Sequence, residues 1–248
     1  MGEELEKIYT WKIDSLSLFL RYFVFAGISY FIFYVWKSKT FQKIKIQEAV
    51  PSKNHIVREI LFSISTLLIH CAAGWMAFYM WKAGHTKIYL NISDQSGFYF
   101  IFSVLAMILI HDTYFYWTHR FIHLPGIYNL IHKVHHRSTN PTPWASFSFH
   151  PLEALISVGV LPIYLFCMPV HPIALFLFLT GMTLINVLGH LGYEIFSSGF
   201  RKSEYGKWHN TSSNHNLHHQ NQQYNFGLYF SFWDRIMNTY LAPQELKK

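Results

Sequence analysis

Three short clusters of histidine are the residues in this sequence best suited to chemistry. They are His119 and His123 in HRFIH, His132, His135 and His136 in HKVHH, and His215, His218 and His219 in HNLHH. Residues three or four apart share one face of an α-helix, so each cluster is predicted to present its imidazoles together. Crowded imidazoles repel one another when protonated, whereas neutral imidazole is the commonest metal ligand. The clusters therefore predict a metal site.

The number of histidines favours two metal ions. His190, at the end of an apolar run, brings the eight clustered histidines to nine. One tetrahedral zinc needs only four ligands, so nine suit two ions of higher coordination with room for other ligands. Imidazole suits iron, copper, nickel or zinc, but zinc has no redox chemistry. Next to a membrane, this ligand set favours iron and the oxidation of a lipid.

The composition is that of a membrane protein. Of 248 residues, 51% are apolar and only 13% are charged, against about 25% charged in an average soluble domain. The same composition excludes a disordered chain. The net charge is +7, but the basic residues form no dense tract, so we expect no nucleic-acid partner. Cys71 and Cys167 both lie in apolar runs, which excludes a disulfide framework.

Five apolar segments must position the histidines. They cover about 16–36, 60–81, 97–117, 152–168 and 172–188, and roughly 20 apolar residues span a bilayer. The last two are joined only by Pro169-Val170-His171, which predicts a tight helical hairpin. We expect residues 1–248 to form a single all-α integral membrane domain. Its transmembrane helix bundle would carry a cytosolic helical cap, from 111–150 and 190–240, that holds a dinuclear metal site.

Loop charges predict the orientation of the chain. Six basic residues lie between the first two apolar segments, whereas only Lys82 and Lys87, with Asp94, lie between the second and third. The positive-inside rule places the first loop in the cytoplasm. Both histidine-rich stretches then face the cytoplasm. The sequence leaves open whether the membrane is a bacterial inner membrane or the endoplasmic reticulum.

The three histidine boxes, in this order, resemble the membrane fatty acid hydroxylase and sterol desaturase superfamily. HDTYFYWTHR, FHPLE, GHLGYE and FWDRIMNTY resemble that family as well, so the likeness covers roughly residues 100–240. The tail and the short first box are closer to the sterol C5-desaturase branch. The resemblance implies a four-helix transmembrane bundle with a di-iron centre in its cytosolic cap. It also implies an enzyme that uses O2 and two electrons to hydroxylate or desaturate a lipid, in lipid biosynthesis.

The same resemblance assigns residues to the site. The implied iron ligands are His119, His123, His132, His135, His136, His190, His215, His218 and His219. A tenth ligand is left open between Glu194 and His209. Metal-bound histidines usually donate their other N–H to a carboxylate or carbonyl, which makes Asp112 and Glu153 candidates for that role, and Asp234 a weaker one. His111 and His150 are further candidates close to the metal.

The expected partners are the bilayer, a lipid substrate and a separate electron donor, because we expect no electron-carrier domain within this sequence. The donor would be a cytochrome b5-like protein, a ferredoxin-like protein or a reductase. A basic face could dock an acidic donor, although the positive-inside rule explains the same charges: Arg120, Lys133, Arg137, Arg201, Lys202 and Lys207. The alternative function is a membrane metal-binding or transport protein without oxidase activity. Transport would favour ionisable residues spread through the spans, where only His70 is central.

Overall fold

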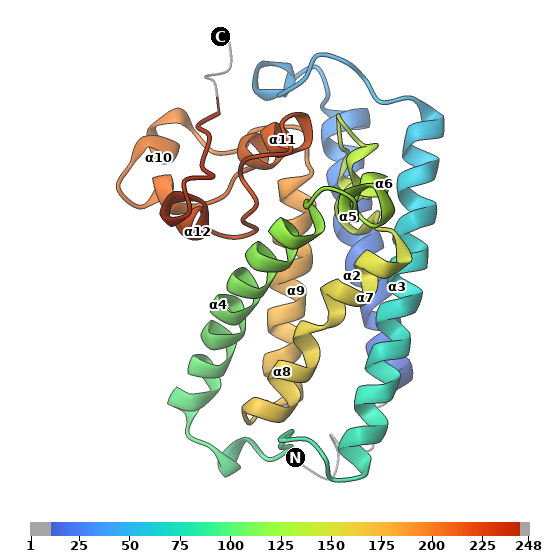
Figure 1. Ribbon diagram of the computed structural model, residues 1–248, viewed down its shortest axis with the longest axis vertical. Helices are drawn as coiled ribbons and strands as arrows, with labels where there is room; N and C mark the ends of the chain where they lie inside the picture. The colour runs from blue at the N-terminus through green and yellow to red at the C-terminus, as the bar shows by residue number, and fades with distance from the viewer. Residues whose placement is uncertain (1–10, 244–248) are drawn as a thin grey trace.

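The structure, a computed structural model that describes residues 11–243, is built from helices, with three isolated β-bridges and no strand in that range. Four long helices lie side by side (Figure 1). They are α2 (Trp11–Tyr30), which continues as the π-helix η1 (Phe31–Trp36), α3 (Lys53–Lys82), α4 (Gly97–Ile122) and α9 (Pro172–Gly189). The predicted all-α bundle is confirmed.

Three of the four long helices, α3, α4 and α9, begin at described capping residues. Ser52 and Ser96 accept hydrogen bonds from backbone N–H groups in the first turns of α3 and α4. His171 caps α9 through its ring, and Pro172 occupies the first helical position, where its missing N–H costs nothing. These caps fix the ends of the apolar segments and so fix the depth at which each helix starts.

All four long helices are long and apolar enough to cross a bilayer, and they keep their apolar faces outward. Only 17–28% of the residues in their most apolar windows are buried inside the protein. Phe98, Leu61 and Leu109 are among the exposed large side chains. A soluble protein rarely exposes so continuous an apolar surface. The chain is therefore a multi-pass membrane protein.

The fourth predicted segment is not a spanning helix. It forms α7 (Pro151–Val158) and α8 (Val160–Cys167), which together are too short to count among the four candidate spans. This pair descends inside the bundle and returns as α9 (Figure 1). The expected hairpin is therefore made of one short, interrupted arm and one full-length arm.

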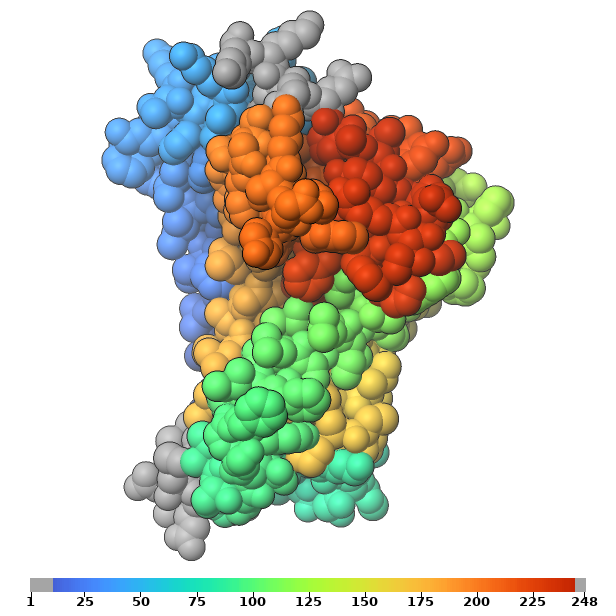
Figure 2. All heavy atoms as spheres, turned by 90° about the vertical axis from the view of Figure 1, so that its left-hand side faces the viewer, coloured from blue at the N-terminus to red at the C-terminus, as the bar shows by residue number. Residues whose placement is uncertain are grey.

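A cap of short elements covers one end of the bundle. Its helices are η2 (Gln42–Ile44), α5 (Ile127–Leu130), α6 (Lys133–His136), η4 (Pro143–Phe147), α10 (Ser198–Lys202), η5 (Gly206–Trp208), α11 (Ser212–Gln220) and α12 (Phe232–Ile236), whereas η3 (Ile92–Asp94) lies at the opposite end. Figure 2 shows the C-terminal part of the cap, in orange to red, over the upper end of α4. The cap brings segments distant in sequence together above the helices.

The protein has two hydrophobic cores, of which the upper one joins the cap to the bundle. The upper core packs Tyr22 of α2 and Leu67 of α3 against Phe147 and Phe149 of the cap segment. The hydroxyls of Tyr22 and Ser63 both donate to the carbonyl of Trp144, each over 2.9 Å. The lower core lies between α4, α8 and α9. The segment carrying η4 is thus held between helices, which fixes the floor of the site above it.

Candidate metal centre

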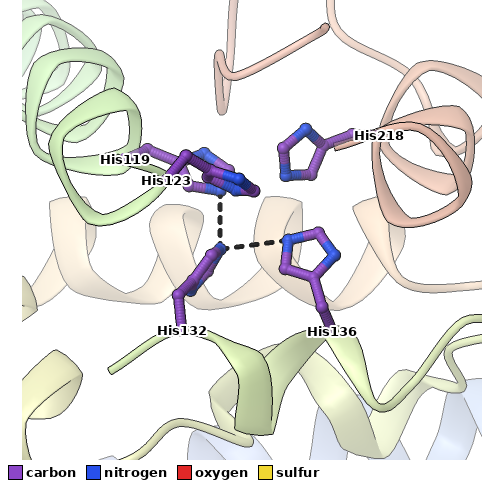
Figure 3. A group of neighbouring side chains, drawn as sticks. All are labelled: His119, His123, His132, His136 and His218. Carbon is purple, nitrogen blue, oxygen red and sulfur yellow. Dashed lines mark hydrogen bonds between the residues drawn. The ribbon is translucent and has the colours of Figure 1, made fainter. Parts of the chain in front are cut away.

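Nine buried or half-buried histidines meet in the cap as two groups that could each hold a metal ion. The five-histidine group is His119, His123, His132, His136 and His218. The four-histidine group is His135, His190, His215 and His219. Within each group, one nitrogen from every ring lies within 4.8 Å of the others. Figure 3 shows the five-histidine group, with rings from α4, from the segment around α6 and from α11 converging on one point.

The second and third histidine boxes divide between the two groups. His132 and His136 belong to the five-histidine group, whereas His135 belongs to the other. Likewise His218 belongs to the five-histidine group, but its neighbour His219 does not. We expected each box to present one face. Because successive residues are about 100° apart around a helix, adjacent histidines instead point into different groups. The second and third boxes thereby link the two groups, whereas both histidines of the first box belong to the five-histidine group.

The two groups adjoin one another. The ring centroids of His136 and His219 lie 4.8 Å apart, and those of His135 and His132 lie 5.3 Å apart. The two groups therefore pack directly against each other. This adjacency is what a dinuclear centre requires.

Hydrogen bonds show that the ring nitrogens at the centre of the five-histidine group are free to bind a cation. Nδ1 of His119 donates to the carbonyl of Phe226 over 2.8 Å, and Nδ1 of His218 donates to the carbonyl of Tyr224 over 2.6 Å. Their neutral rings therefore carry no hydrogen on Nε2. Nε2 of His119 nevertheless lies 3.1 Å from Nε2 of His132, and Nε2 of His218 has no partner among the described residues. Lone pairs that converge in this way need a cation between them.

The four-histidine group has the same arrangement. Nδ1 of His190 donates to the carbonyl of Asn186 over 2.8 Å. Its Nε2 points at Nε2 of His215, at 2.9 Å, and at Nε2 of His135, at 3.4 Å. Nε2 of His219 is 3.2 Å from that of His215. The donor set of both groups fits a transition metal that accepts imidazole nitrogen.

The environment keeps these imidazoles neutral. Burial lowers the pKa of His190 to about 4. Burial, reinforced by neighbouring imidazoles, also lowers the pKa of the seven other ligand candidates that lie outside the spanning helices: His123, His132, His135, His136, His215, His218 and His219. A metal binds the neutral form of imidazole, so the site is prepared for one at neutral pH.

Glu153, a candidate partner for a metal-bound histidine, lies next to His132. Its Oε1 accepts a hydrogen bond of 2.7 Å from Nδ1 of His132. This arrangement orients the ring and raises the basicity of its other nitrogen. Asp234 acts one step further away, since its carboxylate accepts the N–H groups of Phe226 and Gly227 and so fixes the carbonyl that orients His119.

The other predicted residues lie outside both groups. Both oxygens of Glu194 accept backbone N–H groups, and His209 packs against Phe200 and Phe230. Asp112 accepts from the N–H groups of Tyr229 and Phe230 instead of from a histidine. The ring of His150 caps α7, and His111 bonds to the hydroxyl of Tyr229 over 2.6 Å.

Sequence reasoning missed the backbone carbonyls that orient three of the rings. They belong to Asn186, Tyr224 and Phe226. Every residue has a backbone carbonyl, so the residue type does not show which carbonyl orients a ring. The only signal was Asn225, next to both loop carbonyls, because asparagine is enriched at positive φ and adopts a φ of 59° here.

Two cavities reach the centre. One of about 40 Å³ lies against both groups and is lined by His119, His135, Phe149 and Glu153, among others. A larger one, of about 280 Å³, runs between the apolar sides of α4 and α9 up to His215. A long apolar molecule could therefore approach the histidines from the hydrocarbon region.

The fold and the site define a multi-pass membrane protein with a paired histidine centre above its helix bundle. The family model described as fatty acid hydroxylase matches residues 104–239, more than half of the chain. The chain belongs to this family. The extent of the match agrees with the likeness expected over roughly 100–240.

The curated relatives indicate the branch of the family to which this chain is similar. The lathosterol oxidase of Rattus norvegicus is 30% identical over 238 residues, which cover 95% of this chain and 75% of the relative. That of Homo sapiens is 26% identical with the same coverage. The Delta(7)-sterol 5(6)-desaturase of Saccharomyces cerevisiae is 27% identical over 97% of this chain and 62% of its own length. No solved structure matches significantly. The chain is an oxidoreductase of the sterol desaturase-like branch and a lipid oxidase.

Proposed function

We propose that this protein is an O2-dependent di-iron oxidase that hydroxylates or desaturates an unactivated C–H position of a membrane lipid. The observation that carries the proposal is the pair of adjoining imidazole groups whose free ring nitrogens converge beside a cavity. Five and four ligands leave an iron ion room for a further ligand, unlike the closed four-ligand site of a structural zinc.

Two iron ions would be held by the five-histidine group and the four-histidine group. When bound, they would supply the activation of O2 and the oxidising power to remove hydrogen from carbon. The protein's own part is to keep the imidazoles neutral and oriented. Glu153 and the carbonyls of Phe226, Tyr224 and Asn186 do this by accepting the Nδ1 hydrogens.

The surroundings of the small cavity would exclude water and position one carbon. Phe115, Ile122, Phe149 and Ile156 line it together with the histidines. A dry, shaped cavity protects a reactive oxidant and holds the substrate in one geometry. Whether oxygen is inserted or a second hydrogen is removed would then depend on how the neighbouring carbon is placed.

The substrate we propose is sterol-like or fatty-acyl. The names of the curated relatives, lathosterol oxidase and Delta(7)-sterol 5(6)-desaturase, favour the sterol-like class. The apolar cavity between α4 and α9 suits either class, because its walls are mostly aliphatic and aromatic.

We also propose that the cap faces the cytoplasm and receives electrons from a separate protein. The basic loop after α2 lies at the cap end of the bundle, as the positive-inside rule requires for this orientation. Lys133, Arg137 and Lys202 are exposed on the cap and would attract an acidic donor.

The test combines metal analysis with turnover. Detergent-purified protein is expected to carry about two iron ions per chain, one for each imidazole group. With lathosterol, O2 and a reducing system, it is expected to release an oxidised sterol, and His135→Ala combined with His218→Ala should abolish this. Folded protein that binds no metal, or a double variant that keeps full activity, would show that the di-iron assignment is wrong.

A further inference from the structure

Residues 123–137, here called the edge segment, connect the outside of the cap with both histidine groups. The segment carries α5 and α6, which lie above α7 and across the cap from α10 (Figure 1). His132 and His136 of this segment belong to the five-histidine group, and His135 belongs to the four-histidine group. Other residues of the same segment, Leu124 and Leu130 among them, are exposed. The outer surface of the edge segment is therefore separated from the imidazoles by very little protein.

His123, at the start of the edge segment, is the most accessible ligand candidate. It is half-buried, whereas the other eight histidines of the two groups are buried. Its Nε2 is buried and has no hydrogen-bond partner among the described residues. Its ring centroid lies 4.6 Å from that of His132 and 4.9 Å from that of His218. One ring thus reaches from the surface of the cap to the point where the five-histidine group converges.

Tyr128 places a second half-buried ring beside His123. Its ring centroid lies 5.5 Å from that of His123 and 5.8 Å from that of His136. Electron transfer between two proteins slows steeply with distance, so a donor protein must bring its redox group close to the acceptor. A protein that covers the edge segment would come close, because rings at this surface directly contact the ligand candidates.

The charge of this surface is positive. No aspartate or glutamate occurs between residues 113 and 152. Lys133 and Arg137 are exposed. A terminal nitrogen of Arg58, on α3, donates to the carbonyl of Arg137 over 3.1 Å and adds a third cation. Glu59, the next residue of α3, is fully buried and so presents no charge at the surface. The edge segment is therefore complementary to an acidic partner.

Two exposed leucines lie among these cations. Leu124 is 49% exposed and Leu130 is 63% exposed. Apolar side chains surrounded by charged ones are typical of protein–protein interfaces, which have an apolar centre and a polar rim. An anionic lipid surface would attract the same charges. A lipid, however, gains nothing from contact with a ligand of the metal centre, so the position of His123 favours a redox protein.

We propose that the edge segment is the docking surface for an acidic one-electron carrier protein, and that electrons enter the five-histidine group from this side by way of His123. This proposal rests on the proposed function for its need of electrons. In each docking event the reduced carrier would lose one electron, and the metal ion of the five-histidine group would gain it. Two such events would supply the two electrons of one turnover.

The experiment measures docking without turnover. Protein purified in detergent, with the metal it carries, is titrated with two acidic probes, the soluble haem domain of a cytochrome b5 and a ferredoxin. Wild type is expected to bind at least one probe, more tightly at low salt because salt screens exposed charges. Lys133→Glu and Arg137→Glu should each weaken binding at low salt roughly fivefold, since each replaces an attractive charge with a repulsive one. Leu130→Ser, which changes no charge, should weaken binding at low and at high salt.

Lys202→Glu is the matched control, because it makes the same change of charge on α10, across the cap (Figure 1). It should weaken binding less than about twofold. Mixing with the reduced probe in the absence of O2 gives a second measurement. Oxidation of the probe should slow in Lys133→Glu and not in Lys202→Glu.

Three outcomes would overturn the proposal. Wild type could bind neither probe, Lys202→Glu could weaken binding as much as Lys133→Glu, or oxidation of the probe could be unaffected by Lys133→Glu. If neither probe binds and Lys133→Glu instead reduces the anionic phospholipid retained by the purified protein, the surface contacts lipid. Metal content, measured on the same samples, separates each of these results from failure of the di-iron assignment.

Discussion

Nδ1 of His132 lies 2.7 Å from Oε1 of Glu153, while the second carboxylate oxygen of Glu153 has no partner among residues 11–243. Glu153 is 5% exposed and stands at the start of α7, the short arm that enters the bundle. The interrupted helix formed by α7 and α8 therefore also positions a side chain of the metal site. It brings a carboxylate to the back of one ligand of the five-histidine group.

Replacing Glu153 is expected to weaken the metal site without removing a ligand. Glu153→Gln leaves an oxygen to accept the hydrogen of His132 but loses the negative charge that raises ring basicity. Loss of such a partner typically costs 10–100-fold in metal affinity or activity. Metal retention against a chelator and turnover should both fall by roughly this factor. Glu204→Gln, on the exposed pair with Lys207, is the control and should change neither.

Adjacent histidines in the third box should have separable effects. His218→Ala removes a ligand of the five-histidine group only, and His219→Ala removes one of the four-histidine group only. Each variant is expected to lose about one of two bound metal ions. Elemental analysis of purified protein measures this, with His209→Ala as a control that keeps both. Loss of metal from His209→Ala would mean that the division into two groups is incomplete.

The metal-free protein is expected to lose stability in acid. Burial lowers the pKa of His190 from its ordinary 6.5 to about 4, and other cap histidines shift in the same direction. Between these values the unfolded chain binds protons that the folded chain does not. The free energy of unfolding therefore falls as pH falls through this window, by about 1.4 kcal/mol per pH unit for each such histidine. Thermal unfolding of chelator-treated protein at a series of pH values tests this. An unfolding temperature that stays constant between pH 6.5 and 4 would contradict it.

Asp234 is expected to stabilise the site from a distance. Its carboxylate accepts from the N–H groups of Phe226 and Gly227 and from the hydroxyl of Thr239. Asp234→Ala leaves these donors unbonded and frees the carbonyl that orients His119. The free energy of unfolding should fall by about 1–3 kcal/mol, with weaker metal retention. Thr239→Val removes only one of these bonds, so its effect should be clearly smaller. Equal effects would point to general loss of packing.

The orientation can be tested with the native cysteine at the far end of the bundle. Cys167 is exposed at the end of α8, away from the cap. On intact cells or sealed right-side-out vesicles, a membrane-impermeant maleimide is expected to label Cys167. Lys202→Cys, in a Cys167→Ser background, should react only after permeabilisation. The opposite pattern would place the histidines outside the cytoplasm.

The sequence by itself determined the class of the protein and the histidines that are candidate metal ligands. Low charge and long apolar runs dictate a membrane bundle because few other environments tolerate so much exposed apolar surface. The histidine boxes predicted a metal centre because no other common use of imidazole needs such crowding. His190 is distant from every box in the sequence, and its place at the end of an apolar segment made it a candidate, which the family resemblance then supported.

Only the tertiary structure decided how these ligands are shared. Helical periodicity places His135 and His136 on one short helix, but which neighbouring rings each one meets depends on where α9 and α11 are packed. Tertiary structure also places both candidates for a tenth ligand, Glu194 and His209, outside the two histidine groups. The carbonyl of Phe226 meets Nδ1 of His119, 107 residues away in the sequence, through a contact between distant segments. Such contacts depend on the packing of the whole chain, which no local pattern of residue types records.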